Sequence, residues 1–146
     1  MKEEGTTELL NILNQVEPSN MDCFIRQYGS DQMNTSIFSE YIAENNITAA
    51  SIVQNCAGLV SKSYVYDILS GIKTQPSRDI ILILCMAAKM DRKMTRRVLE
   101  TYHHRDLYPK DTRDIIIATY INNKEYNLNQ INDELDRYHL PLLKSL

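Results

Sequence analysis

Cysteine, glycine and proline are all scarce in this chain of 146 residues, which holds three cysteines, four glycines and four prolines. The few turn residues argue against an all-β fold, because many short strands need frequent glycine and proline in their connections. Cys23, Cys56 and Cys85 are odd in number and far apart, so they indicate neither a disulfide framework nor a zinc site. We interpret them as buried, reduced thiols, which favours a cytoplasmic protein.

Long apolar runs are also missing. The longest uninterrupted run covers nine residues, Ile80 to Ala88, about half of what a transmembrane helix needs. The first ten residues, MKEEGTTELL, are acidic where a secretory signal would carry positive charge before an apolar stretch. The sequence therefore predicts no membrane contact and no leader peptide.

The residue patterns of enzymes and metal sites are absent as well. No nucleophile is flanked by glycines, no glycine-rich loop is suited to phosphate, and no acid pair is marked by its context. His103 and His104 are adjacent, so on a helix they point about 100° apart, and no third ligand follows at a useful spacing. The sequence predicts no catalytic residue, no metal and no cofactor.

The net charge of -3 conceals an uneven distribution along the chain. Residues 1–57 carry two basic and eight acidic side chains, whereas residues 58–97 carry eight basic and three acidic ones. Residues 98–146 carry six basic and eight acidic side chains. A basic middle segment between acidic flanks is compatible with contact to nucleic-acid phosphates.

Apolar residues recur at helical spacing through most of the chain, which predicts an all-α fold. We expect an N-terminal helical arm and linker over residues 1–35, a domain of five short helices over residues 36–104, and a C-terminal helical hairpin over residues 105–146. The segment from Ile80 to Met90 is almost wholly apolar. It is therefore expected to be the central helix of the core.

Most of the expected helices have a recognisable start. The first helix of the domain runs from Ser36 to Asn45. Residues of the types that cap helix N-termini precede the later helices, at Thr48, Ser61, Ser77, Asp91, Asp111 and Asn127. Gly58 and Gly71 are expected to end the helices that begin at Thr48 and Ser61.

The helices that begin at Thr48 and Ser61 are joined by the tight turn Gly58-Leu59-Val60. Two short helices with such a turn, the second capped by serine, form the unit that places a helix in the DNA major groove. The segment GLVSKSYVYDILSGIKTQPSRDIILIL resembles the recognition-helix region of the lambda-repressor-like, XRE-type family of bacterial transcriptional regulators. Residues 36–143 resemble a subgroup of that family with an additional C-terminal helical hairpin.

The resemblance implies a five-helix lambda-repressor-like domain that binds double-stranded operator DNA as a transcriptional regulator, with a homodimer on a two-fold site. Outward side chains of the Ser61 helix are the candidates for base edges, Tyr66 being favoured over Tyr64. Lys73, Arg78 and the backbone N–H groups of the Thr48 and Ser77 helix starts are candidates for phosphate. The candidate DNA-binding residues are Thr48, Ser61, Lys62, Ser63, Tyr64, Tyr66, Lys73 and Arg78.

Three departures from the family pattern leave alternatives open. Ala49 stands where members often have a glutamine that holds phosphate, the turn has two aliphatic residues where one is usual, and Asp67 brings an acid to the recognition helix. Ala49, Asp67 and the acidic flanks favour a second hypothesis, a degenerate helix-turn-helix module that binds a protein partner through the arm or hairpin and no DNA. A third is that the arm and hairpin sense a small ligand.

A further basic cluster follows the core helix and comprises Arg92, Lys93, Arg96 and Arg97. A run of charge at helical spacing is usually a solvated helix face, and in the resembled family the corresponding helix tends to lie at the dimer interface. We therefore interpret the cluster as solvated surface and assign it no contact with phosphate.

Overall fold

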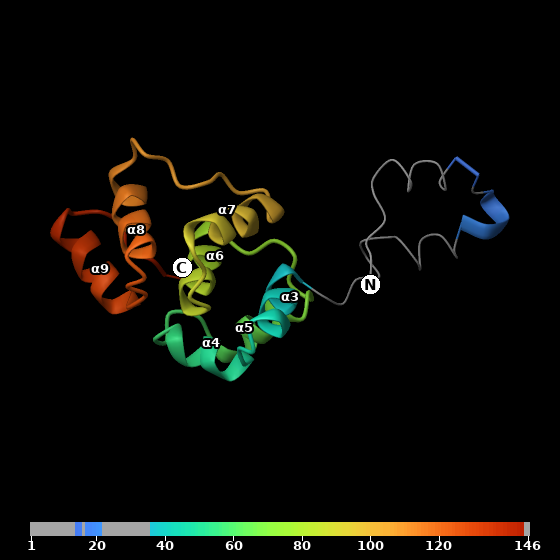
Figure 1. Ribbon diagram of the computed structural model, residues 1–146, viewed down its shortest axis with the longest axis horizontal. Helices are drawn as coiled ribbons and strands as arrows, with labels where there is room; N and C mark the ends of the chain where they lie inside the picture. Colours follow the sequence, from blue (N-terminus) through green and yellow to red (C-terminus); the bar gives the residue numbers. More distant parts are fainter. Residues whose placement is uncertain (1–13, 16, 22–35, 145–146) are drawn as a thin grey trace. The chain divides into compact units, whose positions relative to one another are not determined.

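The computed structural model describes residues 14–15, 17–21 and 36–144 and divides the chain into two compact units, Met1–Asn34 and Thr35–Leu146 (Figure 1). In the first unit the described element is a short 3-10 helix, η1 (Pro18–Asn20). The two amphipathic helices expected in the arm, from Thr7 to Val16 and from Met21 to Tyr28, lie almost wholly outside the described residues.

The second unit is all-helical in the part that the structure describes, which confirms the predicted all-α class there. The helices are α3 (Ile37–Glu44), α4 (Ala49–Asn55), α5 (Lys62–Leu69), α6 (Arg78–Ala87), α7 (Arg92–Thr101), α8 (Thr112–Asn122) and α9 (Leu128–Arg137). None of them is long and apolar enough to cross a bilayer.

All six expected N-caps are confirmed. Each cap side chain accepts a hydrogen bond from the backbone N–H three residues later, as Asp91 does from Met94 at 2.8 Å. Ser36 caps α3 in the same way. These bonds satisfy donors that a helix start leaves without an intrahelical acceptor, which is why the starts could be located from residue type alone.

The predicted glycine stop of α5 is confirmed, because Gly71 follows the C-cap Ser70 with a left-handed φ of 86°. The end of α4 differs from the prediction. α4 is already closed at Ala57, which has a left-handed φ of 53°, and Gly58 follows with a φ of 77°. Other non-glycine residues with positive φ follow helix ends, among them Asn46, Lys89, His103, Lys124 and His139. A left-handed conformation costs a non-glycine residue about 1–2 kcal/mol. The surrounding packing must outweigh that cost.

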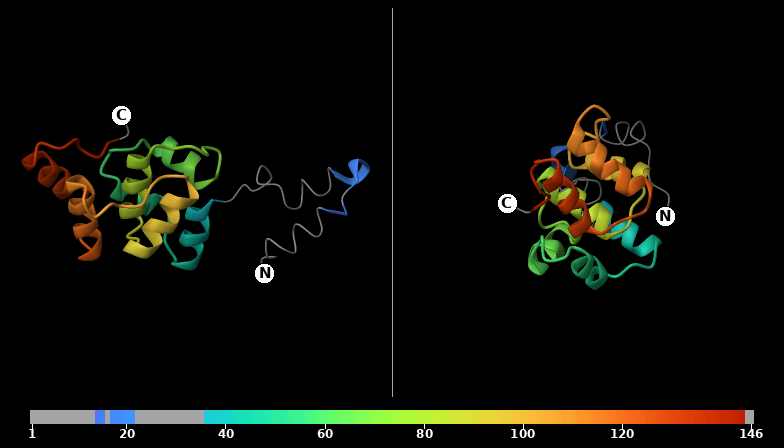
Figure 2. Two further views of the ribbon diagram at one scale, coloured as in Figure 1. Left: turned by 90° about the horizontal axis from the view of Figure 1, so that it is seen from above. Right: turned by 90° about the vertical axis from the view of Figure 1, so that its left-hand side faces the viewer.

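Helix α6 is the centre of the second unit, as its composition predicts. The eight residues Ile80 to Ala87 are all buried, and the helix contacts α4, α7 and α9. In two perpendicular views α6 and α7 lie between the α8–α9 hairpin and α3 (Figures 1 and 2). A helix without a polar face is therefore covered on all sides.

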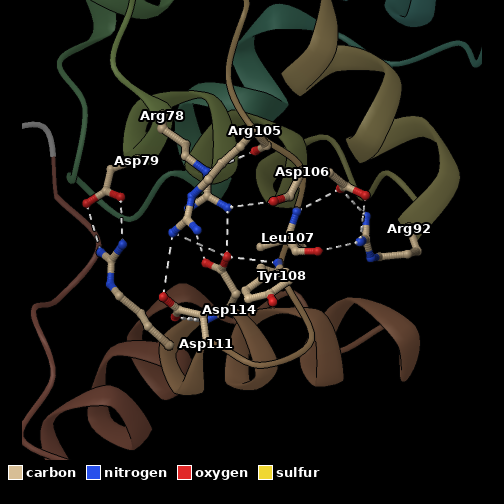
Figure 3. Close-up of polar contacts among 10 residues, drawn as sticks. Arg78, Asp79, Arg92, Arg105, Asp106, Leu107, Tyr108, Asp111 and Asp114 are labelled. Carbon is tan, nitrogen blue, oxygen red and sulfur yellow. Dashed lines mark hydrogen bonds and ion pairs between the residues drawn. The ribbon is translucent and has the colours of Figure 1, made fainter.

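The α8–α9 hairpin is fastened to α6 and α7 by three arginine–carboxylate pairs (Figure 3). Arg78 of α6 binds Asp114 of α8, and Arg113 of α8 binds Asp79 of α6 with two hydrogen bonds of 2.8 Å. Arg92 of α7 binds Asp106 in the segment that leads to α8. Together with apolar contacts, these pairs join the hairpin and the preceding helices into one body.

Candidate nucleic-acid interface

Helix α5 is held from behind by apolar packing and at its end by α3. Its residues Val65, Ile68 and Leu69 are buried in the core. The carbonyl oxygen of Leu69 accepts hydrogen bonds from the hydroxyls of Ser36, at 2.8 Å, and Ser39. These contacts fix the axis of α5 and leave its outer side free for a partner.

Both aliphatic residues of the turn before α5 pack inward. Val60 is buried and Leu59 packs against the core, while the Leu59 N–H donates to the Cys56 carbonyl at 3.0 Å. The second aliphatic residue of this turn therefore contributes to the core.

Three residues on the outer side of α5 are exposed to solvent. Lys62, Ser63 and Tyr66 are exposed, and the Tyr66 side chain is 40% exposed, whereas Tyr64 is half-buried against the core. The Lys62 ammonium lies 6.0 Å from the centre of the Tyr66 ring, within the range of a cation–π interaction. The structure therefore places a cation and an aromatic ring together on the first turns of α5. The hydroxyl of Ser61 is engaged as the cap of this helix.

Lys73 lies beyond the end of α5 but contacts residues of that helix through both its backbone and its side chain. Its backbone N–H donates to the Asp67 carbonyl at 2.9 Å, and its ammonium lies 5.9 Å from the centre of the Tyr64 ring. Within the described residues, neither Lys73 nor Lys62 forms an ion pair with a carboxylate. Two uncompensated cations therefore lie beside tyrosines of one helix.

Thr48 is exposed at the start of α4, and its hydroxyl oxygen accepts a hydrogen bond from the Ser51 N–H at 3.1 Å. The hydroxyl proton of Thr48 is not used in that bond. Asp67 is half-buried, and its carboxylate has no cationic partner among the described residues. The acid thus remains an uncompensated negative charge on α5.

Arg78 differs from the expectation that it is free to contact phosphate. Its guanidinium donates to both Asp114 oxygens, to the Arg105 carbonyl at 3.0 Å and to the Asp106 carbonyl at 3.3 Å. The side chain is 17% exposed. A phosphate would have to displace a carboxylate from these donors, so we assign Arg78 to the anchoring of the hairpin.

The remaining chemically reactive side chains are inward or isolated. Cys56 and Cys85 are free and buried, as predicted, and burial raises the pKa of the Cys56 thiol to about 11. Burial raises the pKa of Cys85 further.

The two adjacent histidines do not form a site. His104 Nε2 lies 2.8 Å from the Pro76 carbonyl oxygen, and His103 follows the end of α7 with a positive φ. No group of histidine, cysteine and acidic residues in the described ranges is arranged to hold a metal ion. Cys23 lies outside those ranges.

Comparison of the chain with protein-family models, with curated proteins and with solved structures found no match.

Proposed function

We propose that this protein is a sequence-specific DNA-binding transcriptional regulator of the lambda-repressor-like, XRE type, with α4 and α5 as its helix-turn-helix. In this proposal α5 enters the major groove and two copies bind a two-fold operator. Lys62, Ser63 and Tyr66 would contact base edges, and Thr48 and Lys73 would contact phosphates.

The observation that carries the proposal is a pair of lysines, one in the first turn of α5 and one just beyond its end. Lys62 and Lys73 are exposed and lie beside the tyrosines of α5, without a carboxylate partner in the described part of the chain. A cation that is already paired loses that interaction when it binds DNA, whereas an unpaired cation releases counterions from the phosphates at no such cost. The rigid attachment of α5 adds support, because a fixed helix loses little entropy on docking.

The experiment selects duplexes from a random-sequence pool with the full-length protein and then measures affinity at ~50 and ~200 mM salt. Each lysine that contacts phosphate contributes about 0.9 to the slope of log affinity against log salt. The double variant Lys62→Ala/Lys73→Ala should therefore bind more weakly with a shallower slope. Lys110→Ala/Lys144→Ala removes the same charge from exposed positions outside α5 and is the matched control. Absence of any salt-sensitive, sequence-preferring complex near ~50 mM salt would refute the proposal.

A second candidate function, a protein-interaction module without DNA binding, is favoured by apolar surface on the hairpin. Ile115 of α8 is 44% exposed and Tyr108 is 48% exposed, and both line a hollow of about 440 Å³. Ile72, at the end of α5, is 73% exposed. If this candidate is correct, Lys62→Ala/Lys73→Ala preserves function in cells and Ile115→Ser abolishes it. The DNA-binding proposal expects the reverse.

A further inference from the structure

A wide groove of about 1060 Å³ is lined by the ends of α3, α4, α6 and α8, by the first two turns of α7 and by the first turn of α9. Four cationic side chains line it: Lys89, Lys93, Arg97 and Lys124. We call this feature the cationic groove. It is separate from the DNA-binding candidates on α5, none of which lines it.

The four cations of the groove are exposed and form no ion pair with a carboxylate in the described residues. This sets Arg97 apart from the other described arginines. Each of the others is paired with an aspartate or glutamate: Arg78, Arg92, Arg96, Arg105, Arg113 and Arg137. Two acids, Glu44 and Asp91, also line the groove, and Asp91 is engaged as the cap of α7. The lining therefore has an excess of positive charge.

Two tyrosines give the cationic groove an aromatic part. Tyr41 and Tyr126 are half-buried and line it, and the Tyr126 hydroxyl donates to the Met90 carbonyl at 3.0 Å. Burial, followed by neighbouring negative charge, raises the pKa of both phenols, so they stay neutral at physiological pH. A planar ring can pack on such residues while an attached anion meets the surrounding cations.

The composition of the groove distinguishes between classes of occupant. The cores of protein interfaces are depleted in lysine and acidic residues. Three lysines and two acids line this groove. The seven large hydrophobic residues exposed in the described part of the chain all lie outside the groove lining. A second copy of the chain would bring the same cations together, which like-charge repulsion opposes. The volume of about 1060 Å³ lies at the upper limit of small-molecule sites, which measure about 300–1000 Å³.

We propose that the cationic groove binds a small organic phosphate with a planar ring, of the size of a mononucleotide. Such a ligand would bridge α7 of the helix-turn-helix body and the α8–α9 turn of the hairpin. It would therefore stabilise their association by mass action. The proposal does not depend on DNA binding by α5.

The experiment measures binding of AMP, GMP, CMP and FMN to the full-length protein by calorimetry and thermal shift. At least one probe is expected to bind with a Kd below ~1 mM at low salt. Adenosine has the planar ring without the phosphate, and inorganic phosphate has the anion without a ring. Each should bind at least about tenfold more weakly than the best probe. The ligand should also raise the melting temperature.

The decisive variant is Lys93→Gln/Arg97→Gln, which removes two groove cations on α7. It should lose at least about tenfold in affinity for the best probe, since the phosphate loses its charge-assisted hydrogen bonds to both side chains. Lys110→Gln/Arg137→Gln removes two exposed cations outside the groove and should bind within about twofold of the unmodified chain. Circular dichroism verifies that both variants are folded.

Three results would overturn the proposal. The first is that no probe binds with a Kd below ~1 mM. The second is that Lys93→Gln/Arg97→Gln binds the best probe as the unmodified chain does, which would place the phosphate elsewhere. The third is that a random-sequence duplex or an oligoglutamate peptide binds through the same two residues while the mononucleotides do not. The groove would then recognise a polyanion.

Discussion

Arg78 and Asp114 form a two-point salt bridge, with nitrogen–oxygen distances of 3.1 and 3.0 Å, between the first turns of α6 and α8. The Asp114 side chain is 1% exposed, and one of its oxygens also accepts the Tyr108 N–H at 2.9 Å. A buried pair is stable only when its remaining polar atoms are satisfied in this way. The relationship therefore ties the hairpin to the core helix at a specific place.

Asp114→Ala should strongly destabilise the protein. It leaves the Arg78 guanidinium largely buried without its carboxylate, and breaking one side of a buried pair costs about 3–5 kcal/mol. Urea unfolding followed by circular dichroism measures the change in the free energy of unfolding. Glu134→Ala removes a carboxylate from an exposed pair with Arg137 and should cost much less than Asp114→Ala, because solvent screens an exposed pair. Equal losses for the two variants would show that the Arg78–Asp114 pair is not a main anchor.

The hydroxyls of Ser36 and Ser39 should matter for the stability of α5. Both donate to the Leu69 carbonyl, so Ser39→Ala leaves one donor and should cost about 0.5–1.5 kcal/mol. Ser36→Ala/Ser39→Ala removes both donors and the α3 cap, and should cost about 2–4 kcal/mol. Ser51→Ala removes an exposed hydroxyl that bonds within α4 and is the control. A double variant as stable as this control would contradict the assigned role.

The elements that could be predicted from the sequence are those set by local chemistry. Thr48, Ser61 and Asp91 cap helices through an N–H only three residues away, and the apolar stretch from Ile80 needs no partner to be identified as buried. Both signals lie within one or two helical turns.

The contacts that were missed join residues far apart in the chain. Arg78 stands in the first turn after a loop, which suggested exposure, but α8 brings Asp114 to it from 36 residues away. The bond from Ser36 to Leu69 spans 33 residues, and no spacing in the sequence pairs them. Ala57 is left-handed without a residue type that favours this conformation. Such features depend on packing and are not encoded locally.

Cys56 should resist alkylation while the protein is folded. Burial holds the pKa of its thiol at about 11, above the value of about 8.5 in an unfolded chain, so at pH 8 the folded protein contains little thiolate. Between about pH 8.5 and about pH 11 the folded protein keeps the thiol proton and the unfolded chain loses it. The free energy of unfolding therefore falls as pH rises through this range. Iodoacetamide labelling with peptide mapping should show slow modification at Cys56 in buffer and rapid modification in urea. Equally fast labelling in both would contradict the assigned burial.

Lys62 and Lys73 should differ in what they contribute to DNA binding, if α5 is the recognition helix. Lys62 lies in the first turn of α5 beside Tyr66, where side chains meet base edges, whereas Lys73 follows the helix and lies beside Tyr64. Lys62→Ala should therefore change the selected sequence and cost about 1–3 kcal/mol on the preferred duplex but little on others. Lys73→Ala should weaken all duplexes alike and lower the salt slope by about 0.9. Competition binding against the selected duplex and a scrambled one measures both effects. If both variants lost affinity uniformly, α5 would contact only the DNA backbone, and sequence-specific readout by this helix would have to be abandoned.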